Sequence, residues 1–218
     1  MSKYSLIHSV RGFNHRTSLM PTPPSKHRRL ILASTSPFRR DLLQRLGLPF
    51  TTRSPEADES RLAGEEAPAL VARLAELKAR SVARHEPGAL VIGSDQVALL
   101  AGEIIGKPGN HEQATAQLRR ASARSVTFYT GLCLFDAATD QRQLAVEAFK
   151  VVFRSLTPAM IERYLRREQP YQCAGSFKSE GLGIALFERL EGDDPTSLIG
   201  LPLIRLIRML EAAGLAVL

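Results

Sequence analysis

Apolar residues form short runs and helix-spaced sets that alternate along the chain from Arg29 onward. Apolar runs predict strands at residues 30–33, 48–53, within 89–100, and at 103–105, 125–135, 144–153 and 184–187. Apolar positions at helical spacing predict helices after Ser36, after Pro68, over 110–120, after Thr157 and over about 202–213. This alternation of strands and helices is typical of an α/β protein.

The length and composition fit a folded protein. The chain has 218 residues, of which 44% are apolar and 23% are charged, enough for one domain or two small lobes with a sizeable core. No stretch approaches the roughly 18 consecutive apolar residues that a membrane span needs, so no membrane association is expected. Residues 1–28 mix Ser, His, Asn, Pro and basic residues without periodicity, which indicates a disordered N-terminal extension. Residues 29–218 are expected to form the folded domain.

The charge distribution argues against nucleic acid as a partner. The net charge is +7, but residues 1–29 hold six Lys and Arg residues and no Asp or Glu, which leaves only +1 for the rest. The body is therefore nearly neutral, and charge alone gives no reason to expect it to bind nucleic acid. The N-terminal segment has no apolar core of a secretory signal, and Cys133 and Cys173 lack C-x-x-C spacing. We therefore expect a cytoplasmic protein with two reduced thiols.

A strand-to-helix turn at residues 34–40 is the first candidate for binding chemistry. Ser36 suits the N-cap of the helix and Pro37 its first position, and Arg39 and Arg40 follow. A helix N-terminus presents unpaired N–H groups, and guanidinium groups donate paired hydrogen bonds to phosphate. The turn alone is read equally well as a triphosphate cradle or as a capped helix with solvated arginines.

Asp95 is the second candidate, because it ends a predicted apolar strand in the segment Gly93–Val97. A carboxylate in such a place loses hydration unless it has a partner. Ligands of open α/β sheets gather at the carboxyl ends of strands. We interpret Asp95 as a general base or a metal ligand, with a hydrogen-bonded structural aspartate as the alternative.

Two lysines, a loop and an acidic cluster complete the candidates. Lys107 lies in a Gly-Lys-Pro turn, and Lys78 falls on or beside the helix face marked by Leu70, Val71, Leu74, Leu77 and Val82. Beside a phosphate cradle these lysines would contact phosphate, although lysines at such positions are mostly solvated. The loop 173–181 is rich in small residues and carries Glu180, and the cluster Glu56, Asp58 and Glu59 suits a divalent cation or a solvated loop. The sequence has no Walker A, zinc, nucleophile-elbow or dinucleotide motif.

Taken in order, these segments resemble the Maf family of nucleoside triphosphate pyrophosphatases. The matching stretches are residues 32–40, 55–59, 93–97, 106–108, 173–181 and 191–196, and together they span nearly everything after Arg29. The resemblance implies a mixed sheet with flanking helices, folded into two lobes around a central cleft. It also implies a homodimer whose substrate is a small nucleotide.

The resemblance further implies a role for each matching residue. Asp95 would accept the proton of the water that attacks the α-phosphorus, and Glu59 and Asp95 would bind a divalent cation, Mg²⁺ or Mn²⁺. The residues that would hold the triphosphate are Ser36, Arg39, Arg40, Lys78 and Lys107.

Three further positions match the branch of this family that acts on 7-methyl-GTP. They are Phe38, where that branch often has Trp, together with Gln96 and Glu180. Methylation at N7 makes guanine cationic, so it favours both an aromatic face and a nearby carboxylate.

Two alternatives stay open from the sequence. One is a pyrophosphatase for unmodified nucleotides such as dTTP or UTP. The other is a regulatory protein that binds nucleotide or nucleic acid without turnover, although such a protein has no need for a buried base such as Asp95 near phosphate.

Overall fold

The computed structural model describes residues 28–218, so the predicted extension lies outside the described residues except for Arg28. The strands are β1 (Leu30–Ala33), β2 (Phe50–Arg53), β3 (Leu90–Leu100), β4 (Glu103–Ile105), β5 (Ser125–Asp136), β6 (Gln141–Phe153) and β7 (Phe187–Glu191). The α-helices are α1 (Pro37–Gln44), α2 (Ala67–Ala83), α3 (His111–Ala121), α4 (Pro158–Glu168), α5 (Pro195–Ile199) and α6 (Leu203–Ala212). Two short 3₁₀ helices are η1 (Ala174–Ser176) and η2 (Leu182–Leu186). This content confirms the α/β class.

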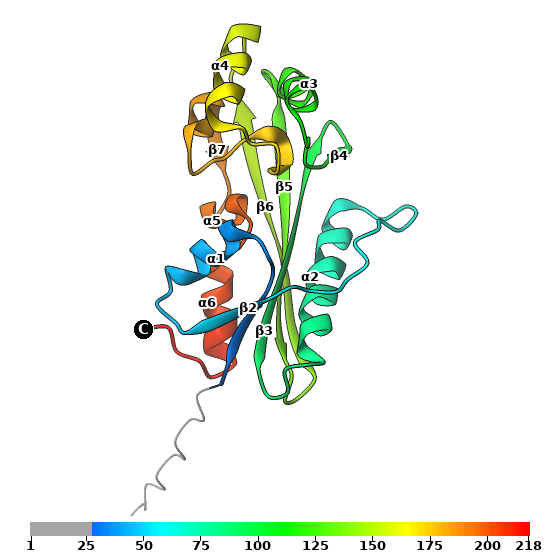
Figure 1. Ribbon diagram of the computed structural model, residues 1–218, viewed down its shortest axis with the longest axis vertical. Coiled ribbons are helices and arrows are strands. Elements are labelled where there is room, and N and C mark those ends of the chain that lie inside the picture. Colours follow the sequence, from blue (N-terminus) through cyan, green and yellow to red (C-terminus); the bar gives the residue numbers. More distant parts are fainter. Residues whose placement is uncertain (1–27) are drawn as a thin grey trace, which may run out of the picture.

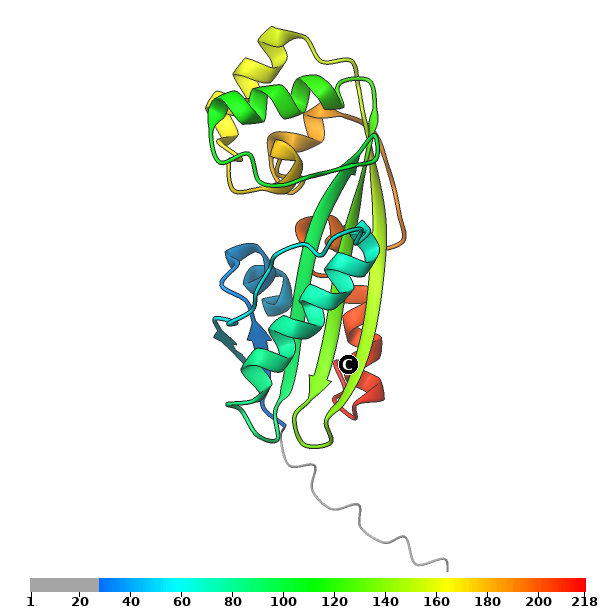
Figure 2. The same ribbon diagram turned by 90° about the vertical axis from the view of Figure 1, so that its right-hand side faces the viewer.

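The strands form one mixed sheet of seven strands within residues 28–218, in the order β2-β1-β3-β5-β6-β7, with β4 on β3. β2, β1 and β3 are parallel, whereas β5, β6, β7 and β4 join by antiparallel pairing. The long strands β3, β5 and β6 run the length of the molecule, and helices gather around both of their ends (Figures 1 and 2). The predicted mixed sheet with flanking helices and two lobes is confirmed.

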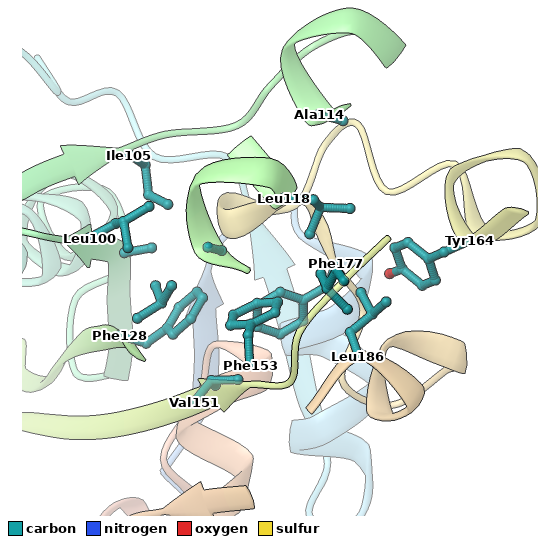
Figure 3. Packing of buried hydrophobic residues seen from close by; sticks show 14 of the residues in the cluster. Leu100, Ile105, Ala114, Leu118, Phe128, Val151, Phe153, Tyr164, Phe177 and Leu186 are labelled. Atoms are coloured by element: carbon teal, nitrogen blue, oxygen red, sulfur yellow. The ribbon is translucent and has the colours of Figure 1, made fainter. Parts of the chain in front are cut away.

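Each lobe has its own apolar core. In the lobe with both termini of the described chain, α2 covers one face of the sheet, and α1 and α6 cover the other (Figure 1). The core of the second lobe packs α3, α4 and both 3₁₀ helices on the far ends of β3, β5 and β6 (Figure 3). Phe177 lies at its centre, with edge-on contacts to Phe128, Phe153 and Phe187. The apolar packing of one lobe is thus separate from that of the other, and the long strands β3, β5 and β6 join the two lobes.

Two glycines let α2 lie unusually close to the sheet. A Cβ added at Gly93 of β3 would lie 2.1 Å from the carbonyl oxygen of Ala75, and one added at Gly131 of β5 would lie 2.1 Å from that of Val71. Any side chain at these positions would therefore collide with the helix backbone. Because neither glycine has a side chain, the backbone of α2 can lie in direct contact with the adjacent strands β3 and β5.

The structure corrects three expectations about local structure. Leu77 was expected on the buried face of α2, but it is 37% exposed, whereas Lys78 is 6% exposed and lies in the buried stripe with Leu74 and Ala75. The stripe recurs every three or four residues, and position 77 falls between its rows. Residues 184–187 lie mostly in η2, and the strand begins only at Phe187. The strand expected over 48–53 begins at Phe50.

The close approach of α2 predicts that Gly93→Ala and Gly131→Ala each destabilise the fold. Overpacking a tight contact costs roughly 1–3 kcal/mol or more, and here the obstacle is backbone that cannot rotate away. Urea unfolding monitored by circular dichroism would measure the loss. Gly106→Ala is the matched control, because its Cβ would meet nothing within 4 Å. An unchanged midpoint for Gly93→Ala would contradict this packing.

Candidate functional site

A cavity of about 630 Å³ is lined by residues of both lobes. The lobe with β1 contributes the β1–α1 turn, the inward face of α2 and Glu59. The second lobe contributes Lys107 and the loop 172–180. Segments distant in the sequence therefore meet at one place, as the predicted central cleft requires.

The cavity reaches the sheet where β3 changes neighbours. β1 pairs with β3 as far as Ile92, and β4 pairs with it from Ala98 onward. Between these points neither strand pairs with that edge of β3, so Asp95 lies in an open stretch of it. The expectation that Asp95 ends a strand is corrected, because β3 continues to Leu100 and it is β1 that ends nearby.

Asp95 is 7% exposed and has a lysine as its partner. The ammonium nitrogen of Lys78 lies 2.6 Å from Oδ1 of Asp95 and 3.0 Å from Oε1 of Glu59. Glu59 lies toward solvent, with 60% of its side chain exposed. Two carboxylates from different segments thus converge on one buried cation at the wall of the cavity.

The β1–α1 turn forms as the sequence predicts. The hydroxyl of Ser36 accepts a hydrogen bond from the backbone N–H of Arg39 at 3.4 Å, and Pro37 begins the helix. Nε of Arg39 donates to the carbonyl oxygen of Gly200 at 2.9 Å. Burial lowers the pKa of the Arg39 guanidinium, an effect that Asp95 and Glu59 oppose. Arg39 is thereby oriented beside the two carboxylates.

The segment from α5 to α6 supports the site from behind. Gly200 has a φ of +122°, a backbone conformation that favours glycine. Its carbonyl oxygen accepts hydrogen bonds from Nε of Arg39 and from the hydroxyl of Ser94, both at 2.9 Å. Asp194 caps the N-terminus of α5 by accepting a hydrogen bond from the N–H of Thr196, and its carboxylate also accepts one from the N–H of Ile204 at 2.8 Å. The sequence patterns did not predict α5, because a helix of five residues carries too little periodicity.

Gln96 lines the cavity, but its amide nitrogen is used within the protein. It lies 2.7 Å from the carbonyl oxygen of Ser197, 3.2 Å from that of Leu198 and 3.0 Å from Oγ1 of Thr130. These partners anchor α5 to the sheet. Gln96 therefore has a structural duty in addition to its predicted selecting role.

The remaining predicted site residues divide between the cavity and the surface. Phe38, Lys107 and Glu180 line the cavity together with the groups above. Arg40 does not line it: its side chain is mostly exposed and lies 3.4 Å from Asp41. The helix rotates adjacent arginines by about 100°, so only Arg39 reaches the cleft.

The loop that carries Glu180 adds three polar residues to the site beyond those predicted from the sequence. Gln172, Cys173 and Ser179 also line the cavity. Lys178 points elsewhere, because its ammonium donates to the carbonyl oxygen of Glu168 at 2.8 Å. The small-residue composition of this loop was the available signal, but it does not tell which side chains face the cavity.

The pair Glu59 and Asp95 is chemically suited to a divalent cation. Mg²⁺ is usually bound through one or two carboxylates together with substrate phosphates, rather than by a full protein cage. No group of three or more His, Cys, Asp or Glu residues that could hold a metal ion occurs within residues 28–218. The Lys78 ammonium already bridges both carboxylates, so it marks a position where they can share a cation.

The fold and cavity define a two-lobed α/β protein with a charged cleft. A family model described as "Maf-like protein" matches residues 29–213, and the chain belongs to the Maf family. It is 58% identical to a 7-methyl-GTP pyrophosphatase of Nitrosococcus oceani, over 91% of this chain and 98% of that protein. Proteins with the same name in Vibrio cholerae and a Polaromonas species are 58% and 52% identical, over 86% and 97% of this chain and 97% and 95% of theirs.

Within residues 28–218, no helix has both the length and the apolar character needed to cross a membrane.

The burial of Cys173 predicts a slow thiol. Burial, and to a lesser degree Glu180, raises the pKa of this thiol to about 11. Its reactive thiolate should therefore be roughly a hundredfold scarcer at pH 8 than that of a cysteine with a pKa near 9. Alkylation by iodoacetamide, followed by mass spectrometry, should be slow at pH 8 and accelerate toward pH 11.

Cys133 provides the comparison, because it is fully buried and its pKa is raised to about 12. Cys173→Ser should remove the faster of the two labelling reactions. Rapid labelling of Cys173 at pH 7 would contradict the raised pKa of its thiol.

Proposed function

We propose that this chain hydrolyses 7-methyl-GTP to 7-methyl-GMP and diphosphate, which removes a modified nucleotide from the pool. The observation that carries the proposal is the convergence of every predicted site residue except Arg40 on one cavity. Curated relatives that are 52–58% identical over most of both chains are named for this substrate. Identity at this level, together with an intact site, supports the same chemistry.

Binding of the triphosphate is assigned to the cations and hydroxyls of the cavity. Arg39 and Lys78 approach from one lobe and Lys107 from the other, and Ser36 lies at the N-terminus of α1. Guanidinium and ammonium groups neutralise phosphate oxygens, and a helix N-terminus adds N–H donors. Fixing the triphosphate across both lobes would orient the α-phosphorus for in-line attack.

Asp95 is the proposed proton acceptor. Its carboxylate takes a proton from water, the water oxygen bonds to the α-phosphorus, and the bond from that phosphorus to the leaving diphosphate breaks. Glu59 and Asp95 would hold a divalent cation, Mg²⁺ or Mn²⁺, whose chemistry is to neutralise charge that develops on phosphate oxygens. Arg39, held by Gly200, adds a fixed positive charge beside Asp95.

Selection of the base is assigned to Phe38 and Glu180. A cationic methylated guanine stacks on an aromatic ring, and a carboxylate both attracts the charge and accepts ring N–H groups. Gln96 would act by holding α5 and the cavity floor in position as well as by any contact with the base. The homodimer, the cytoplasmic location and the exclusion of nucleic acid as a partner stay predictions.

Asp95→Asn should abolish hydrolysis and leave nucleotide binding largely intact. The amide has nearly the same size but lacks basicity and binds a metal ion poorly. Diphosphate release measures turnover, and equilibrium dialysis with labelled nucleotide measures binding. Asp140→Asn makes the same change at an exposed surface position and should behave like the unmodified protein. Turnover close to normal in Asp95→Asn would overturn the assignment.

Glu180→Gln should lower kcat/KM for 7-methyl-GTP far more than for dTTP or UTP. A hydrogen bond to a charged group is worth about 1.5–3 kcal/mol, so the loss should be roughly tenfold to a hundredfold. Phe38→Ala should weaken binding of 7-methyl-GTP by about 0.5–2 kcal/mol, because the stacking contact with the cationic base is lost. A nucleotide panel assayed by diphosphate release would measure these ratios.

Glu188→Gln is the matched control, because Glu188 is exposed and outside the cavity lining. Equal losses for every nucleotide in Glu180→Gln would make Glu180 a general structural or catalytic residue. Equal cleavage of dTTP and 7-methyl-GTP by the unmodified protein would favour the alternative of an enzyme for unmodified nucleotides. Binding without any turnover would favour the regulatory alternative.

A further inference from the structure

Lys78 is already paired with carboxylates in the nucleotide-free protein, whereas a lysine that only binds phosphate would have no such partners there. Its ammonium lies 2.6 Å from Asp95 and 3.0 Å from Glu59, the two carboxylates assigned above to a divalent cation. The Lys78 ammonium is thus engaged in ion pairs with both carboxylates and is not available to phosphate unless these ion pairs break.

The backbone restricts where the Lys78 side chain can go. Lys78 lies in the buried stripe of α2 next to Ala75 and Ala79, which pack on Gly93 of β3. Only 7% of its side chain is exposed, so its aliphatic part is enclosed between the helix and the sheet. The ammonium is therefore held beside the two carboxylates at the wall of the cavity.

The charge of the site explains why this contact matters. Two carboxylates close together repel each other, and an ammonium between them removes most of that repulsion. A divalent cation bound to the same pair would compete with the ammonium for the same oxygens. It would also repel the ammonium, because both are positively charged. Once displaced, the ammonium would be free to pair with a triphosphate bound in the same cavity.

We propose that Lys78 is an internal counter-ion that occupies the cation position between Glu59 and Asp95 in the nucleotide-free protein. The divalent cation then enters together with the nucleotide, and the ammonium transfers from the carboxylates to a phosphate group. This inference rests on the proposed function, because it takes the metal-binding pair from it. It adds a second duty for Lys78 and an order of binding that phosphate contact alone does not imply.

The test is the affinity of the nucleotide-free protein for Mn²⁺, followed by electron paramagnetic resonance of the unbound ion. Lys78→Met removes the ammonium and keeps the apolar stem, so it should bind Mn²⁺ at least about tenfold more tightly than the unmodified protein. Adding Asp95→Asn to Lys78→Met should abolish this gain, which shows that the carboxylate pair is responsible. Equal affinity of Lys78→Met and the unmodified protein would overturn the proposal.

Lys107→Met is the matched control, because it removes the same charge from the lining of the same cavity on the opposite lobe. Lys107 is exposed and its charge is screened, so its removal should change Mn²⁺ affinity by less than about twofold. A gain in Lys107→Met equal to that in Lys78→Met would reduce the effect to net charge and overturn the assignment to Lys78.

The unmodified protein supplies a second measurement that does not depend on a variant that folds. Its affinity for Mn²⁺ should rise at least about tenfold when a nonhydrolysable 7-methyl-GTP analogue is bound, after correction for Mn²⁺ held by unbound analogue. An affinity that is the same with and without the analogue would overturn the proposal. Neither titration needs turnover, so failure of this inference is separate from failure of the hydrolysis assays.

Discussion

The contact between α2 and the sheet is the constraint on which the candidate site depends. Gly93 and Gly131 have no side chains, so the backbone of α2 lies directly on β3 and β5. Lys78 follows Ala75 by one helical turn, and Asp95 follows Gly93 by two residues on the same face of β3. The close backbone contact at Ala75 and Gly93 therefore brings Lys78 and Asp95 together as its direct neighbours. The ion pair at the centre of the site follows from packing of backbone on backbone.

In the open stretch of β3, side chains on the two faces of the strand have different roles. Asp95 points to the α2 face, whereas Ser94 and Gln96 point to the opposite face and bind carbonyl groups of the α5 segment. One of these carbonyl groups, that of Gly200, also accepts a hydrogen bond from Nε of Arg39. Arg39 and the strand residues on either side of Asp95 are therefore connected to the same α5 segment through a few hydrogen bonds.

The two-lobed architecture decides which ligands can use the whole site. Arg39 and Lys78 belong to one lobe, while Lys107 and Glu180 belong to the other, and each lobe has a separate apolar core. A ligand that contacts all four must span the cleft with anionic groups and offer a feature that complements a carboxylate. A nucleoside triphosphate with a cationic base meets both conditions, which is why membership of the Maf family and the chemistry of the cavity agree.

The sequence by itself determined the α/β class, most strands and helices, and the helix starts, because periodicity and capping are local properties. Helices were predicted to begin next to Ser36, Asn110 and Thr157, and the side chain of each caps the N-terminus of a helix in the structure. Only the tertiary structure decided which polar side chains meet. It directed Lys78 inward and Leu77 and Arg40 outward, turned residues 184–186 into a 3₁₀ helix, and engaged the amide of Gln96 with α5. Helical spacing separates Lys78 from Leu77 and Arg39 from Arg40, but which of each pair faces the sheet or the cleft depends on packing against residues far apart in the chain. The 3₁₀ helix and the partners of Gln96 also depend on such contacts, which leave no signal in local spacing.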